Sequence, residues 1–358
     1  MNKKPLVSAM VILTLAVSQS FAGTKFGNDE NMWFSIGAGV RTSFNTIEDA
    51  TSNDTDDFEL DSIRLYLNGQ IVKNLKFTFN AEREIDGNVR MLDGIARLEF
   101  NDALNIWLGR FLPPSDRSNL SGPYYLGTWD FPIAQAFPNI YAGRDNGAAV
   151  WGHMMDGKFK YQVGAFQGSD GAGSANDSNN LLYAGKATIN FWEPEGGYYN
   201  ASTYYGEKEV LTFGLTTMQQ SDATGTVTNR GDFSGWSADL LMEKKLDTAG
   251  VVSLEGAYYD YDLDNLSWSG DTGGPIQGDG YFVLAGYLFP RAIGIGKLRP
   301  HIRHESFDAD TNPNMKRTTL GLTYVMKGHN ARITAVVGET DNGSNTRNFF
   351  RIGVQLQY

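Results

Sequence analysis

The chain has 358 residues, with 41 acidic and 30 basic side chains, and its formal net charge is −11. It contains 41 glycines and no cysteine, which excludes disulfide bonds, cysteine-ligated zinc and thiol catalysis. The acidic balance argues against a nucleic-acid partner, because such proteins need a basic face. Abundant glycine, tyrosine and phenylalanine with few prolines favour an all-β chain with many turns.

The first 22 residues have the layout of a secretory signal peptide. Two lysines precede the short apolar stretch Leu6–Val17, and Ser20 and Ala22 place small residues before a cleavage site after Ala22. We therefore expect residues 1–22 to be a signal peptide and residues 23–358 to form one exported domain. The sequence contains no internal run of about 18 apolar residues, so it predicts no membrane-spanning helix.

Apolar and polar residues alternate with a period of two throughout the exported domain, which predicts strands with two different faces. The predicted strands cover 32–44, 58–71, 75–85, 89–100, 103–112, 146–154, 158–167, 181–191, 209–221, 233–244, 251–262, 280–289, 297–308, 316–327, 331–340 and 347–358. Segments of roughly 10 to 12 residues suit a tilted membrane strand, whereas strands of a soluble sandwich are usually shorter. Short and long connections alternate, so we predict a transmembrane antiparallel β-barrel of 16 strands.

Two connections are longer than this pattern requires. The connection Trp192–Lys208 stands where a short turn is expected, and we expect part of it to be strand. About 30 residues after the predicted strand 103–112 also lack alternation, and loops of that length are usually functional. The lumen of such a barrel is wide, so we expect this third loop to fold inward and narrow it. Its aromatic residues are Tyr124, Tyr125, Trp129, Phe131, Phe137 and Tyr141.

The C-terminal strand alternates apolar residues up to a final aromatic residue. Phe350, Ile352, Val354, Leu356 and Tyr358 follow one another at every second position. This pattern is typical of the strand that outer-membrane barrels present to the barrel assembly machinery, and we assign that role to Phe350, Leu356 and Tyr358. We therefore expect the chain to lie in the outer membrane of a Gram-negative-type bacterium, in contact with outer-membrane lipid.

Several short motifs, in the same order along the chain, resemble the phosphate-selective porin O and P family. They are Ser62–Gly69, Met91–Asp93, Leu108–Phe111 with Pro114, Gly143–Asp145, Trp236–Leu241, Ala257–Tyr261, Gly286–Pro290 and Lys327–Ala331. The resemblance implies a trimeric porin of 16 strands, with an inward-folded third loop and a water-filled path that often favours anions. Leu112 departs from the basic residue that many members have there, so weak anion binding is expected.

The polar face of each predicted strand is expected to face the lumen, and its charges are modestly cationic. The basic candidates are Arg41, Arg64, Lys76, Arg97, Lys158, Lys160, Lys186, Arg299, Arg303, Arg317, Arg332 and Arg351. The acidic candidates are Glu82, Glu84, Asp93, Glu99, Asp239, Glu243, Glu255 and Glu305. Rows of arginine and lysine bias a pore toward anions. Solvated pairs that merely keep the wall wet are the alternative interpretation.

We expect the constriction and its selectivity to depend on a subset of charged residues. They are Arg64, Lys76, Asp93, Arg97, Arg117, Arg144, Lys186, Arg299 and Arg303, with the loop aromatics Tyr124, Tyr125 and Trp129 beside them. The predicted function is passive diffusion of small anionic or polar solutes, without enzyme activity, cofactor or metal. A general non-selective porin remains open, as does a structural or adhesin barrel with a plugged lumen.

Overall fold

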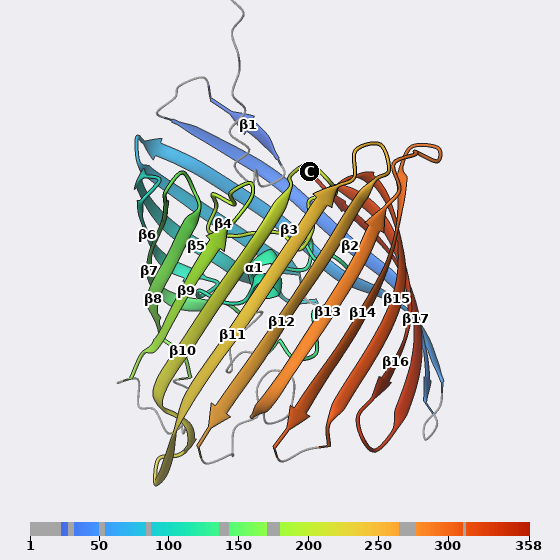
Figure 1. Cartoon of the computed structure of the whole chain (residues 1–358). Helices are drawn as coiled ribbons and strands as arrows, with labels where there is room; N and C mark the ends of the chain where they lie inside the picture. Colours follow the sequence, from blue (N-terminus) through green and yellow to red (C-terminus); the bar gives the residue numbers. More distant parts are fainter. Residues whose placement is uncertain are drawn as a thin grey trace, which may run out of the picture.

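Sixteen antiparallel strands, β2 to β17, close into a barrel in the computed structural model (Figure 1). The structure describes residues 23–27, 32–49, 54–83, 87–135, 143–169, 180–264, 277–310 and 313–358. Each strand pairs with the next in sequence, and the ring closes where β17 pairs with β2, with Ile352 opposite Phe44. The predicted fold class is therefore confirmed.

The strands have the following bounds. They are β1 (Thr24–Phe26), β2 (Trp33–Asp49), β3 (Thr55–Val72), β4 (Leu75–Arg83), β5 (Val89–Asn101), β6 (Leu104–Phe111), β7 (Asp145–Met154), β8 (Phe159–Phe166), β9 (Leu182–Asn190), β10 (Val210–Thr226), β11 (Asn229–Lys245), β12 (Val251–Leu263), β13 (Gly278–Leu288), β14 (Lys297–Ala309), β15 (Met315–Lys327), β16 (Ala331–Asp341) and β17 (Thr346–Gln357). One short helix, α1 (Arg117–Ser121), follows β6. No helix in these described residues is long and apolar enough to cross a membrane.

The period-two pattern has its expected effect on burial. Side chains along β12 and β13 alternate between buried and more exposed positions, because successive residues of a strand point to opposite faces of the sheet. The outward face carries exposed apolar side chains such as Leu65, Val283 and Ile302. An apolar outer band of this kind is what a lipid-facing barrel wall requires.

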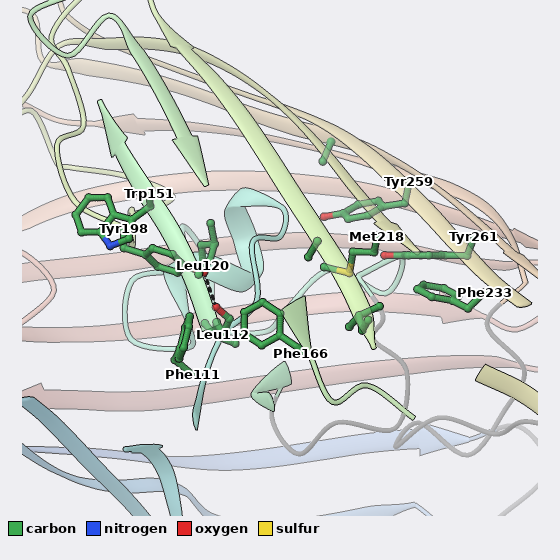
Figure 2. Close-up of a cluster of buried hydrophobic side chains, with 14 of the residues drawn as sticks. Phe111, Leu112, Leu120, Trp151, Phe166, Tyr198, Met218, Phe233, Tyr259 and Tyr261 are labelled. Carbon is green, nitrogen blue, oxygen red and sulfur yellow. Dashed lines mark hydrogen bonds between the residues drawn. The ribbon is translucent and has the colours of Figure 1, made fainter. Parts of the chain in front are cut away.

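The lumen is less polar than the sequence predicted. Apolar side chains are also buried on the inward face, and they form a cluster that includes Trp107, Phe111, Phe166, Phe233 and Tyr259. Figure 2 shows part of this cluster, with Leu112 and Leu120 of the third loop packed among the strand residues. The inward face is partly apolar because it packs against protein rather than only against water.

The C-terminal strand and the start of the described chain meet at one end of the barrel. The main chain of Tyr358 exchanges two hydrogen bonds of 2.8 Å with Ala38 of β2. Beyond that point β1 pairs with β2, with Thr24 opposite Ile36, and the hydroxyls of Thr24 and Tyr358 lie 2.9 Å apart. We call this end, which also holds the turn at 73–74, the turn end, and the opposite end the loop end.

The prediction that part of Trp192–Lys208 is strand is wrong. The connection between β9 and β10, residues 191–209, contains no strand, and we call it the turn insert. It starts at the turn end, and side chains from inside the barrel bind its main chain: Lys160 Nζ donates to Gly197 O at 3.0 Å. The segment is long because it enters the lumen rather than extending the sheet.

Candidate pore constriction

The third loop, which is described over residues 112–135 and 143–144, enters the lumen, and arginines of the barrel wall hold its main chain. Five guanidinium groups donate to carbonyl oxygens between residues 126 and 131: Arg332 to Leu126 at 2.7 Å, Arg299 to Gly127 at 2.7 Å, Arg41 to Trp129 at 2.6 Å, Arg303 to Asp130 at 2.7 Å and Arg317 to Phe131 at 2.9 Å. Charged hydrogen bonds of this kind are roughly twice as strong as neutral ones. These bonds fix the main chain of residues 126–131 against the barrel wall.

Arg299 and Arg303, which were predicted to set selectivity, are two of the arginines that anchor the third loop. Arg299 is 1% exposed and Arg303 is 3% exposed. Arg303 also pairs with Glu305 at 3.0 Å. Both side chains face the lumen as predicted, but they lie behind the third loop and bind its carbonyls.

Two loop aromatics rest on glycines of the wall. The ring of Trp129 covers Gly353, where an added Cβ would lie 2.5 Å from the ring, and Tyr124 covers Gly39 in the same way at 2.7 Å. The guanidinium of Arg41 lies 4.1 Å from the centre of the Trp129 ring. Close approach of an aromatic ring to the sheet requires glycine at such positions. Phe137 and Tyr141 lie outside the described residues.

Tyr125 is the third aromatic predicted beside the constriction; it is partly exposed, and its ring lies 4.9 Å from that of His329. His329 belongs to the turn between β15 and β16, and its Nε2 donates to Thr203 O of the turn insert at 2.7 Å. The tip of the third loop, a short turn and the turn insert therefore meet on this side of the lumen.

Arg117 of α1 joins the third loop to the turn insert. Its guanidinium donates to Glu195 Oε1 at 2.8 Å and Oε2 at 2.5 Å, and both side chains are almost fully buried. Asp239 of β11 lies 3.7 Å from the same guanidinium, and Lys186 of β9 donates to Asp239 at 2.6 Å. Burial by itself raises the pKa of Glu195, but the adjacent Arg117 lowers this pKa to about 2. The four residues form a buried charge cluster, and we call it the Arg117 cluster.

Neutral contacts reinforce this junction. The Tyr198 hydroxyl donates to Leu112 O at 2.9 Å, the dashed line in Figure 2, and Asn200 Nδ2 donates to Arg117 O at 3.0 Å. The Tyr198 ring stacks on Trp107 of β6, with ring centres 4.5 Å apart. Two segments from opposite ends of the barrel therefore pack against one wall and against each other.

A cavity of about 690 Å³ remains between this packed pair and the wall formed by β3 to β7. The charged side chains that line it are Arg64, Lys76, Arg97, Arg144 and Lys208 together with Asp93, Glu99 and Asp102. Its turn-end part is lined by Asn101, the last residue of β5, and by Asp102 in the turn before β6. The lining is charged and aromatic, and it suits small polar solutes.

The charges of the cavity occur largely as ion pairs. They are Arg64–Glu82 at 2.8 Å, Lys76–Glu99 at 2.7 Å, Arg97–Glu99 at 2.5 Å and Arg144–Asp93 at 3.1 Å. Arg64, Lys76, Asp93, Arg97 and Arg144, which the sequence singled out, thus come together around one cavity. Arg117 and Lys186 do not join them, because both lie in the Arg117 cluster.

Sequence reasoning missed the turn insert as part of the site. Pro194, Gly196, Gly197, Tyr198, Tyr199 and Asn200 line the cavity. The unusual length of Trp192–Lys208 is the signal in the sequence that points to it. No group of three or more histidine, cysteine, aspartate or glutamate side chains within the described ranges is placed to hold a metal ion.

Comparison with known proteins gives matches in structure but not in sequence. No protein-family model and no curated protein matches the chain. OprB of Pseudomonas putida has a TM-score of 0.62 at 11% identity, covering 92% of this chain and 94% of that chain. OmpF of Salmonella typhi, in complex with daunomycin, scores 0.58 at 13% identity, covering 94% and 100%. The outer membrane channel DcaP of Acinetobacter baumannii scores 0.56 at 13% identity, with the same coverage. At such identities the likeness establishes the barrel fold alone.

Proposed function

We propose that the chain is an outer-membrane porin through which small hydrophilic solutes diffuse down their gradients. The observation that carries the proposal is a cavity of about 690 Å³ with charged lining, inside a closed barrel whose outer face is apolar. Such a barrel offers lipid its apolar wall and gives solutes a polar interior. The fold shared with the outer membrane channel DcaP supports this function.

The same proposal assigns the partners. Outer-membrane lipid contacts the outer wall, and the barrel assembly machinery recognises Phe350, Leu356 and Tyr358 after export by residues 1–22. The proposed functional oligomer is a homotrimer. Its support is the family resemblance and a trimer form of OmpT of Vibrio cholerae, which has a TM-score of 0.53 at 12% identity over 91% of this chain and 99% of that chain.

The cavity favours anions weakly. Five basic side chains line it against three acidic ones. Most of these charges are paired, so the field at the cavity is that of a small excess rather than of an open arginine cluster. A charge pair 4 Å apart interacts by only about 1 kcal/mol in bulk water and several-fold more near low-dielectric walls, so a several-fold preference is expected. The resemblance to the phosphate-selective porin family makes phosphate the first anion to test.

Reversal potentials in a planar bilayer test this function. Wild-type channels in a KCl gradient should show anion preference at low salt, and the preference should shrink toward 1 M salt, where the Debye length is about 3 Å. Arg64→Gln with Arg144→Gln should move the reversal potential toward cations. Arg230→Gln, at the loop end and outside the cavity lining, is the matched control and should leave the reversal potential unchanged. A cation-selective wild type would refute the charge assignment.

A structural or adhesin barrel with a plugged lumen is the second candidate. The observation in its favour is the extent to which the third loop and the turn insert fill the lumen, with Trp129, Tyr124 and Tyr198 all about 1% exposed. Single-channel conductance separates the two functions. A properly folded wild-type barrel that carries no current in the bilayer would refute the porin and support the plugged barrel.

A further inference from the structure

The turn insert forms the wall of the cavity opposite β5 and β6. Its residues Pro194, Gly196, Gly197, Tyr198, Tyr199, Asn200 and Lys208 line the cavity, and so do Arg97 of β5 and Trp107 of β6. The Tyr198 ring stacks on Trp107, so the insert meets this strand wall at the edge of the cavity. A solute that occupies the cavity therefore lies between the insert and the strand wall.

The insert is held in place at both its ends and its middle. Its ends pair with each other and with β10: Phe191 N donates to Leu211 O at 2.8 Å, and Glu193 N donates to Glu209 O at 3.0 Å. Its middle is fixed by Glu195 in the Arg117 cluster, by Lys160 bound to Gly197 O, and by Gln162 Nε2, which donates to Tyr198 O at 3.1 Å. A segment with this many buried contacts behaves as part of the barrel wall rather than as a free turn.

Gly196 is the point where the insert leaves room in the cavity. The residue is exposed, and a Cβ added to it would lie 3.5 Å from His153 Nε2, which is ordinary van der Waals contact. Lys208 lines the cavity as well, and its Nζ donates to Pro194 O at 3.1 Å. Bulk or charge added at Gly196 would therefore enter the cavity without displacing the barrel wall.

We propose that the turn insert is the second half of the constriction, and that it sets the size limit and part of the charge preference from the turn end. The third loop forms the other half from the loop end. The inference rests on the proposed porin function. It places permeation control at a segment between β9 and β10 that contributes no strand. This segment lines the cavity with two glycines, two tyrosines, a proline, an asparagine and one charged residue, Lys208.

The absence of cysteine from the whole sequence permits a direct test. Gly196→Cys carries a unique thiol, and Ser344→Cys, in the connection between β16 and β17 at the loop end, is the matched control. Both variants are reconstituted in planar bilayers and treated with either a sulfonatoethyl or a trimethylammonium-ethyl methanethiosulfonate reagent. Heat-modifiable migration on gels checks folding, Gly196→Ala checks that the position tolerates a side chain, and mass spectrometry checks labelling.

Labelled Gly196→Cys should lose conductance in a discrete step with either reagent. Its reversal potential should shift toward cations with the negative reagent and toward anions with the positive one. Labelled Ser344→Cys should keep wild-type conductance and reversal potential. The proposal is overturned if labelled Gly196→Cys conducts as before, or if its thiol resists reagents that label Ser344→Cys. A non-conducting wild type would instead refute the porin function itself, so the two failures are distinguishable.

Discussion

Separating Arg117 from Glu195 tests whether the third loop and the turn insert act as one unit. The two side chains are 3% and 2% exposed, and the guanidinium donates to both carboxylate oxygens, at 2.8 and 2.5 Å. Arg117→Met leaves Glu195 buried without its main cation. Removing one partner of a buried pair costs about 3–5 kcal/mol, whereas replacing both partners by apolar side chains is often nearly neutral.

The loss in the free energy of unfolding depends on which buried charge each variant leaves unpaired. After Arg117→Met, Asp239 keeps its 2.6 Å contact with Lys186, so the unpaired charge is that of Glu195 alone. We expect Arg117→Met and Glu195→Leu each to lower the free energy of unfolding by about 3 kcal/mol or more. The double variant should lose much less than the sum of the two, which gives a coupling energy on the order of 3 kcal/mol.

The assay is a double-mutant cycle of urea unfolding in lipid vesicles, together with limited proteolysis of the third loop. The exposed pair Lys244–Glu209, 3.6 Å apart with side chains 47% and 32% exposed, is the matched control. Lys244→Met should change the free energy of unfolding by less than about 1 kcal/mol. Losses that simply add in the double variant, with no increase in cleavage of the loop in either single variant, would refute the proposed joint between the two segments.

Three further predictions use other parts of the lumen. First, burial raises the pKa of Glu195, but Arg117 lowers this pKa overall to about 2, below the ordinary value of 4.5. The stabilising contribution of the Glu195 carboxylate is therefore complete above pH 4.5 and declines as the pH falls toward 2. The stabilities of Glu195→Gln and wild type should converge at acid pH, and a constant difference between them would contradict the assignment. Second, Gly353→Val should displace the Trp129 ring, because the added Cβ would lie 2.5 Å from it. The substitution should lower the free energy of unfolding by about 1–3 kcal/mol and change the tryptophan fluorescence. An unaltered fluorescence spectrum would show that the ring does not rest on Gly353. Third, Tyr358→Ala should reduce the amount of protein in the outer membrane, because it alters the expected assembly signal and removes the hydroxyl beside Thr24; normal levels on immunoblots would count against that role.

The strand pattern could be predicted from the sequence because it depends on local alternation. Arg64 and Leu65 are neighbours in the chain, and the strand period of two puts the first in the lumen and the second on the outer face. The same argument placed the sixteen strands within a few residues of their observed bounds, with 251–262 predicted and Val251–Leu263 observed. The inward direction of Arg299 and Arg303 followed in the same way, since it requires only knowledge of the strand.

What those inward side chains bind was decided by the tertiary structure. Arg299 meets the carbonyl of Gly127, which is 172 positions away in sequence, and Arg117 meets Glu195, which is 78 positions away. No local pattern encodes such pairs, because they depend on two connections entering the lumen from opposite ends. The sequence by itself therefore determined the barrel, its number of strands and the inward face of strand charges such as Arg64 and Arg299, whereas Lys158 is exposed in the turn before β8 and Glu84 lies outside the described residues. Only the tertiary structure decided which arginines and lysines line the cavity and which bind the third loop. The reason is that a buried charge needs a hydrogen-bond or ion-pair partner, and the fold determines which group lies beside it.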